Sequence, residues 1–196
     1  MAGLKADDAF PEGVSFLYIP PTGDLDLKVC GMPIKYDASK GMSCHPPSLS
    51  QTKTGTLCVR EIRLANRIPL EFQSKKVVLV AVPGAFTPTC QEQHVTSYLA
   101  NLEQFKAKGV DNIIFIAMND PFVMSAWGKA NGVKDESILF MTDTDAGFSK
   151  SIGWESGGRT MRYAIIIDHG KVTYADVDTE RGSIAKSGAK GVLVKL

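Results

Sequence analysis

Short continuous runs of apolar residues recur along the chain after residue 76. They occupy residues 77–82, 113–118, 138–141 and 163–167, the last within a strand predicted over 162–168. Runs of this length without polar interruption are typical of strands that are buried on both faces of a sheet. Between the first two runs, apolar residues recur three and four positions apart, which predicts one continuous amphipathic helix over residues 91–108 ending at Gly109. Its apolar face would consist of Val95, Tyr98, Leu99, Leu102 and Phe105.

The remaining elements follow from local signals. Asp120 and Pro121 predict the N-cap and first residue of a second helix that runs to about residue 130. A strand is expected at 16–19, a short helix at 146–152, a loose connection at 156–160, a hairpin of 162–168 with 171–177, and a terminal helix after Ser183. This order predicts an α/β protein with a thioredoxin-like fold, in which helices flank a central mixed sheet.

Composition narrows the class of protein. The 196 residues suit a single domain, and 44% hydrophobic with 22% charged residues is typical of a globular protein. A net charge of +1 without a basic run argues against nucleic acid and anionic membranes as partners. No apolar run is long enough to span a membrane, and residues 1–8 lack the apolar core of a signal peptide. We therefore expect an intracellular protein.

The redox chemistry of the chain is limited to four cysteines, which are Cys30, Cys44, Cys58 and Cys90. They form no CxxC pair, and the neighbouring Cys44 and His45 have no second pair with which to hold a metal. Neither a zinc site nor a secreted disulfide scaffold is expected, so any disulfide would be catalytic or redox-sensing.

Residues 41–70 do not fit the rest of the chain. They show no sustained periodicity, and a structureless loop longer than about 12–15 residues is uncommon inside a domain. Codons for residues 41–43, 65–66 and 70–71 can contain GTATGT, GCTAAC and CTAG, which resemble the donor, branch point and acceptor of an intron. One interpretation is that 41–70 is translated intron within a single domain spanning 1–196. The other is a genuine loop of this lineage.

Cys90 is the candidate nucleophile. It follows a buried strand and a turn that contains Pro83, Gly84 and Pro88, at the first turn of the predicted helix. A helix N-terminus favours a thiolate over a thiol, and Thr87 could direct a hydroxyl at the same point. The alternative is a buried structural cysteine.

A thiolate that attacks a peroxide also needs positive charge for the oxygen that leaves. Arg162 is preferred to Arg159 for this purpose because it opens a predicted strand and therefore lies at an end of the sheet. Pro83 could help to exclude water, although turn punctuation explains it equally well. His94 is interpreted as a hydrogen-bonded structural histidine, with support of the loop before Cys90 as the alternative.

The segment 83–90, Pro-Gly-Ala-Phe-Thr-Pro-Thr-Cys, resembles the PxxxTxxC signature of the peroxiredoxins. The form PGAFTPxC is similar to that of the atypical, alkyl-hydroperoxide-reductase-like (type 5) subgroup. Residues 119–123, 126–129 and 148–153 also resemble this subgroup, including fungal members among the mould allergens. The resemblance covers 1–40 and 71–196.

The resemblance implies a thioredoxin-fold peroxidase without metal, haem or flavin. Cys90 would be the peroxidatic cysteine, assisted by Pro83, Thr87 and Arg162. It would reduce hydrogen peroxide and alkyl hydroperoxides, pass through a sulfenic acid, and form a disulfide with Cys30 across a homodimer. Thioredoxin or a similar dithiol would reduce that disulfide, in antioxidant defence and redox homeostasis.

Two alternative functions would use the same fold or the same cysteine. A thiol-disulfide oxidoreductase on the same fold is disfavoured by the missing CxxC. A redox-switched chaperone or peroxide-sensor module would use Cys90 as its sensor. The C-terminal Val194-Lys195-Leu196 approximates a peroxisomal signal, but valine replaces the preferred small residue, so the cytosol is expected.

Overall fold

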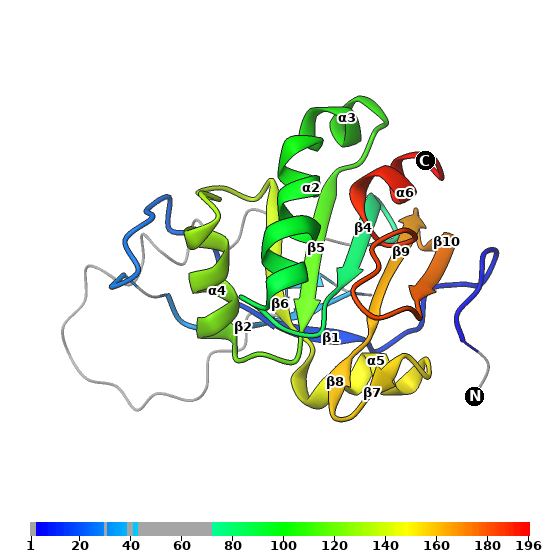
Figure 1. The fold of residues 1–196 in the computed structure, drawn as a ribbon, viewed down its shortest axis with the longest axis horizontal. Coiled ribbons are helices and arrows are strands. Elements are labelled where there is room, and N and C mark those ends of the chain that lie inside the picture. Colours follow the sequence, from blue (N-terminus) through cyan, green and yellow to red (C-terminus); the bar gives the residue numbers. More distant parts are fainter. Residues whose placement is uncertain (1–2, 30, 39–40, 43–71) are drawn as a thin grey trace.

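The computed structural model describes residues 3–29, 31–38, 41–42 and 72–196, and it is built on a mixed eight-stranded sheet (Figure 1). The strand order is β10-β9-β4-β5-β6-β1-β2-β3. The bounds are β1 Ser15–Tyr18, β2 Ile34–Asp37, β3 Gly41–Met42, β4 Lys76–Ala81, β5 Asn112–Ala117, β6 Ile138–Thr142, β9 Arg162–Asp168 and β10 Lys171–Asp178. β4, β5 and β6 are parallel, whereas β9 and β10 continue one edge and β1, β2 and β3 the other with antiparallel pairing.

Helices cover both faces of this sheet, as the order of elements predicted. One face carries η1 (Cys90–Val95), α2 (Thr96–Ala100), α3 (Leu102–Ala107), α4 (Pro121–Ala130) and α6 (Ala189–Leu193). The other face packs against α5 (Gly147–Ser151), which follows the short η2 (Thr144–Ala146). In Figure 1, α2 lies in front of the central strands and α4 lies to the left of β6.

Alternation along the central strands divides the interior into two cores. Val78 and Val80 of β4 belong to the cluster under α2 and α4, whereas Leu79 and Ala81 point to the opposite cluster. Because side chains alternate between the two faces of a strand, a strand covered on both faces must be apolar at nearly every position. This requirement explains the uninterrupted apolar runs from which these strands were predicted.

The helix predicted over residues 91–108 is not continuous, which corrects the expectation from sequence. The chain forms the π-helical η1, then α2, and after Asn101 (φ −114°, ψ 14°) the separate helix α3. Hydroxyls of Thr96 and Ser97 donate to the carbonyls of Glu92 and His94, and such bonds bend helices. The predicted apolar face is nevertheless directed to the core, and Gly109 ends the segment at φ +77°.

The connection at 156–160 is also more regular than predicted. Glu155–Ser156 (β7) and Arg159–Thr160 (β8) form a small hairpin, and Gly157 and Gly158 occupy its turn with φ of +61° and +80°. Two consecutive glycines with positive φ provide the tight turn that such a hairpin requires. The signal was present in the sequence and was misinterpreted as a loose loop.

Strands β2 and β3 were not anticipated, and β3 takes up the first two residues of the anomalous segment 41–70. The rest of that segment, with Cys44 and Cys58, and the proposed resolving Cys30 lie outside the described residues. The interpretation of 41–70 as translated intron therefore stays a prediction.

The contact between α4 and β6 generates a test of the packing. A Cβ at Gly128 would lie 2.8 Å from Cδ2 of the buried Phe140 ring, closer than side chains normally approach. Gly128→Ala is expected to lower the free energy of unfolding by about 1–3 kcal/mol despite alanine's better helix propensity. Urea unfolding measures the difference.

Gly147→Ala in α5 is the matched control, because its Cβ would meet only Oδ1 of Asp143 at 4.0 Å. It should leave stability unchanged or raised. Equal stability of the Gly128→Ala variant and the parent protein would show that this contact is looser than described.

Candidate active site

A loop that leaves the carboxyl end of β4 forms one wall of the candidate site. The N–H of Val82 donates to the carbonyl of Ile116 (3.0 Å), and Thr160 donates its hydroxyl to the carbonyl of Val82 (2.5 Å). Three residues later along the loop, the N–H of Ala85 donates to Oδ1 of Asn119 (2.9 Å). Residues that follow β5 and end β8 therefore hold the loop between β4 and η1 in place.

Cys90 lies in the first helical turn after this loop, as predicted. Pro88 and Thr89 are already helical, and the N–H of Gln91 donates to the carbonyl of Thr87 at 2.8 Å. Cys90 is fully buried, in the same cluster as Val80 and Val82. The amide groups of a first turn have no acceptor within the helix, so their partial positive charge faces the start of the helix, where this thiol lies.

Thr87 and its neighbours give the loop a compact shape. The Thr87 hydroxyl donates to the carbonyl of Gly84 at 3.0 Å, which leaves the oxygen lone pairs free to accept a further hydrogen bond. A Cβ on Gly84 would approach Cγ2 of Thr87 to 3.3 Å, so the small residue permits this fold of the loop. Phe86 has φ +59°, a strained conformation for an aromatic residue, and Pro83 is half-buried.

Side-chain amides join the helix of Cys90 to α4. The Trp127 indole N–H donates to Oε1 of Gln91 (2.5 Å), Nε2 of Gln91 donates to Oδ1 of Asn131 (2.8 Å), and Nδ2 of Asn131 donates to the Trp127 carbonyl (2.7 Å). The three residues therefore close a ring of hydrogen bonds immediately after Cys90. Sequence reasoning missed Gln91 and Asn131, whose polar side chains carried no distinctive pattern.

Arg162 lies on the same face of the sheet as Cys90. It begins β9, and Ala164 and Ile166, which share its side of the strand, pack in the cluster that contains Cys90. The pairing of Val80 with Ala164 sets Arg162 level with Val82, at the start of the loop. Arg162 is only 9% exposed, and its Nη1 donates to Nδ1 of His94 at 3.2 Å.

The partners of His94 determine its tautomer. Nε2 lies 2.9 Å from the carbonyl of Ser187, which can only accept, and Nδ1 faces a guanidinium, which can only donate. The ring is therefore neutral, with its proton on Nε2. Burial lowers the pKa of His94 to about 4, and the positive charge of Arg162 adds to the lowering, while the bond to Ser187 opposes it.

A second arginine lies outside this core. Arg159 of β8 is exposed, and its Nη1 is 4.0 Å from where a Cβ of Gly84 would be. The loop is therefore flanked by a buried guanidinium, that of Arg162, and an exposed one. Sequence reasoning set Arg159 aside because it expected no hairpin there. Asn119 and Thr160 were missed as anchors, although Asn119 directly follows a predicted strand.

The described part of the chain holds one cysteine, Cys90, because Cys30, Cys44 and Cys58 fall outside it. Within that part, no group of three or more histidine, cysteine or acidic residues is arranged to hold a metal ion. Nor does a helix among residues 3–29, 31–38, 41–42 and 72–196 have the length and apolar character needed to cross a membrane.

Comparisons by family model, by sequence and by structure find relatives of one kind. The family model described as Redoxin matches residues 69–193. Peroxiredoxin AHP1 of Chaetomium thermophilum is 54% identical over 100% of this chain and 96% of its own length. A putative peroxisomal peroxiredoxin of Lipomyces kononenkoae is 40% identical over 96% and 99% of the two chains. The reduced Prx3 of Vibrio vulnificus, solved in complex with H2O2, is 34% identical with a TM-score of 0.65, over 97% of this chain and 98% of that one.

The lowered pKa of His94 predicts a pH dependence of stability. The unfolded chain binds a proton near pH 6.5 and the folded protein only near pH 4, so acid favours the unfolded state between these values. The free energy of unfolding should therefore fall as pH decreases from 6.5 to 4, by up to about 1.4 kcal/mol per pH unit from this group. Urea unfolding across this range measures it.

His94→Gln isolates the contribution of the imidazole, because a glutamine amide can donate to the Ser187 carbonyl and accept from Arg162 without titrating. The stability of this variant relative to the parent protein should improve steadily below pH 6.5. Parallel curves for the two proteins would mean that His94 is not held neutral in the folded state.

Proposed function

The chain belongs to the peroxiredoxins, the thiol peroxidases of the redoxin family, and we propose that Cys90 is the cysteine with which it reduces peroxides. The observation that carries this proposal is the arrangement of Cys90 and Arg162. A thiol in a first helical turn and a buried guanidinium share one face at one end of the sheet. Both features favour a thiolate and stabilise negative charge that develops on a leaving oxygen.

In the proposed reaction, the Cys90 thiolate attacks one peroxide oxygen and breaks the O–O bond. The sulfur is oxidised to a sulfenic acid, and the other oxygen leaves as water or an alcohol after taking a proton. The Thr87 oxygen would accept a hydrogen bond from the O–H of the bound peroxide, because the Thr87 hydroxyl already donates its own proton to the Gly84 carbonyl. Arg162 would stabilise the departing oxygen, and Pro83, which has no N–H, would limit water at the loop.

Hydrogen peroxide and alkyl hydroperoxides are the proposed substrates. Peroxiredoxins use peroxides as substrates and thiols as reductants, and the Vibrio vulnificus relative was solved with H2O2 bound. Cys90 is buried, and the loop residues Phe86 and Pro88 above it are exposed, so a small peroxide would approach through this loop. The likeness of residues 83–90 to the type 5 subgroup supports the inclusion of organic peroxides.

Cys30 is the proposed resolving cysteine. Its thiol would attack the sulfenic acid of Cys90 in a second copy of the chain, releasing water and forming an intersubunit disulfide. The residues that precede it are firmly held. Nζ of Lys129 on α4 donates to the carbonyl of Asp26 at 2.9 Å and to that of Val29. This anchorage would return the segment to one position after each disulfide is reduced.

An exposed apolar surface near the site supports a homodimer. Phe86, Met118, Phe122 and Val123 are 37–52% exposed, and the bond from Ala85 to Asn119 ties the loop to the end of β5 beside them. A second copy of the chain would cover these side chains. Thioredoxin, or a similar dithiol, would then reduce the disulfide by thiol exchange and supply the two electrons for each peroxide.

The proposed location is the cytosol, with the peroxisome as the alternative that the Lipomyces kononenkoae relative suggests by its name. Val194 is 81% exposed, but Leu196 is half-buried against the core. A receptor that reads the last three residues would have to release Leu196 first, which weakens them as a peroxisomal signal.

Replacement of single cysteines tests the mechanism. With thioredoxin, its reductase and hydrogen peroxide, Cys90→Ser should consume no more peroxide than the mixture without enzyme, because Cys90 is the proposed nucleophile and the described residues hold no second thiol. Cys30→Ser should still react once with peroxide but should fail to turn over and should form no disulfide-linked dimer. NADPH oxidation and non-reducing gels provide the two measurements.

Cys44→Ser and Cys58→Ser are the matched controls and should turn over at the parent rate. Peroxide turnover that survives Cys90→Ser would refute the assignment of Cys90. Normal turnover in Cys30→Ser would refute only the resolving role.

The interpretation of 41–70 as translated intron predicts that messenger RNA joins residue 40 to residue 71. Sequencing of the transcript should find the shorter form predominant. A protein that lacks 41–70 should be at least as active in the peroxide assay and more stable to heat. A major transcript that retains the segment would establish it as part of the protein.

A further inference from the structure

We propose that Asp178 is a positioning residue for Arg162, acting through Ser187 and His94. This inference rests on the proposed role of Arg162 beside Cys90 and adds a reason for the orientation of its guanidinium. Asp178 ends β10 and is opposite Arg162 in the register of β9 and β10. It makes no described hydrogen bond or ion pair with Arg162 or with the loop between β4 and η1, which we call the thiol loop. It would act through the segment before α6.

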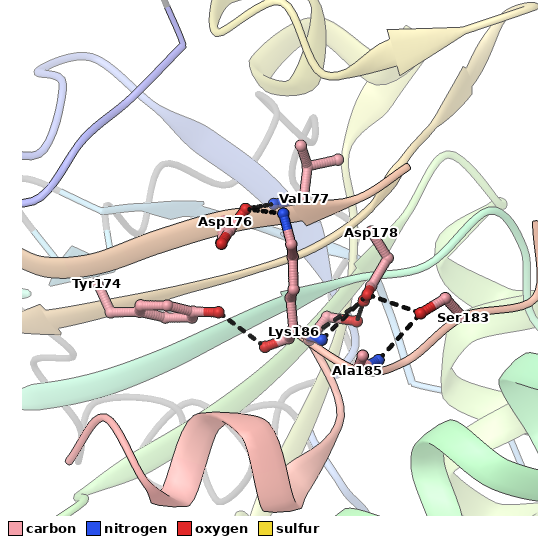
Figure 2. Close-up of polar contacts among 8 residues, drawn as sticks. Tyr174, Asp176, Val177, Asp178, Ser183, Ala185 and Lys186 are labelled. Atoms are coloured by element: carbon pink, nitrogen blue, oxygen red, sulfur yellow. Dashed lines mark hydrogen bonds and ion pairs between the residues drawn. The ribbon is translucent and has the colours of Figure 1, made fainter. Parts of the chain in front are cut away.

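Asp178 organises that segment with four hydrogen bonds. Figure 2 shows its carboxylate directed at Ser183 and Lys186, whose hydroxyl and N–H donate to Oδ1 at 3.1 and 3.0 Å. Oδ2 accepts from the N–H of Ser187 (3.0 Å) and from its hydroxyl (2.5 Å). Burial raises the pKa of Asp178, but these bonds outweigh it and hold the pKa below its usual value, so the group is a carboxylate at neutral pH.

The carbonyl of Ser187 connects this segment to buried side chains of the core. It accepts from Nε2 of His94 at 2.9 Å and from the hydroxyl of Tyr98 at 2.7 Å, and all three residues are fully buried. Asp178 holds Ser187 by its N–H and its hydroxyl, and the N–H of Gly188, which shares a peptide with this carbonyl, donates to the carbonyl of Ile184 at 2.8 Å. Together these bonds give the carbonyl a single orientation. The carbonyl therefore stays aimed at the imidazole.

The orientation of this carbonyl selects the tautomer that Arg162 needs. With its proton on Nε2, His94 presents a lone pair at Nδ1 to Nη1 of Arg162. If Ser187 turned away, the proton could move to Nδ1, where it would point at the guanidinium and push it aside. Asp178 thus controls the direction of Arg162 by fixing where a proton lies on His94.

This arrangement also leaves the charge of Arg162 available. Among the described residues, no carboxylate lies within 4.0 Å of its guanidinium, although Asp178 is its neighbour on β10. A direct ion pair would orient the arginine but would offset the positive charge that a thiolate and a leaving oxygen use. A neutral imidazole orients it without that loss.

A double-mutant cycle in the full chain tests the proposal. Stopped-flow Trp fluorescence of the reduced protein gives the second-order rate constant of Cys90 oxidation by hydrogen peroxide for the parent, Asp178→Asn, Arg162→Gln and the double variant. Each single change should lower the rate constant about tenfold or more, since a hydrogen bond to a charged group is involved. The double variant should be no slower than Arg162→Gln alone.

Matched variants separate positioning from simple destabilisation. Asp176→Asn, two residues earlier on β10, removes a carboxylate that contacts Lys186 and Val177 (Figure 2) and has no described bond to Ser187. It should keep the parent rate. If Asp178→Asn does not fold, Ser187→Ala removes only the 2.5 Å bond and should show a smaller loss with the same non-additivity. Far-UV circular dichroism checks that each variant is folded.

The tautomer of His94 gives a second reading that a merely structural role would not change. Nitrogen-15 NMR should show a single tautomer protonated at Nε2 in the parent protein and a mixture in Asp178→Asn or Ser187→Ala. A parent-like rate in Asp178→Asn, multiplying factors in the double variant, or an unchanged tautomer would overturn the proposal. A parent-like rate in Arg162→Gln would instead overturn the role of Arg162, and this inference with it.

Discussion

A neutral imidazole between a guanidinium and a backbone carbonyl is the interaction on which the candidate active site of this protein depends. His94 accepts from Arg162 and donates to Ser187, with burial keeping the ring uncharged. A buried arginine must satisfy its donors, and most partners that do so carry a negative charge. Here the acceptor is neutral, so the positive charge remains for the chemistry proposed at Cys90.

Sheet register brings these groups together. β9 lies antiparallel to β4, and its pairing sets Arg162 level with Val82, where the thiol loop begins. Side-chain alternation then directs Arg162 to the face that carries η1, which holds both Cys90 and His94. A slip of one residue in this pairing would turn the arginine to the opposite core. The apolar residues that fill both cores therefore protect the geometry of the site.

The loop between β4 and η1 is held in one conformation without substrate. Val82 and Ala85 are tied to neighbouring elements, Thr87 is bonded to Gly84, and Phe86 is held at a positive φ. Strained backbone of this kind persists only where the surroundings determine it. Rigid placement of a nucleophile beside its supporting groups lowers the entropy lost on reaction, which suits a thiol peroxidase.

The strands and the thiol could be predicted from sequence because their signals are local. Apolar runs marked β4, β5, β6 and β9, and proline, glycine and threonine before Cys90 marked the loop. The break at Asn101 and the hairpin of β7 and β8 were missed, since side-chain bonds to the backbone decide the first and a turn of two glycines the second.

The sequence by itself therefore determined the α/β class, the buried face of the helical segment 91–108, and the identity of the candidate nucleophile. These depend on periodicity and turn chemistry within about 20 residues of chain. Only the tertiary structure decided which groups hold Arg162 in place. His94, Arg162, Asp178 and Ser187 are up to 93 positions apart, and strand pairing together with the docking of the segment before α6 brings them into contact.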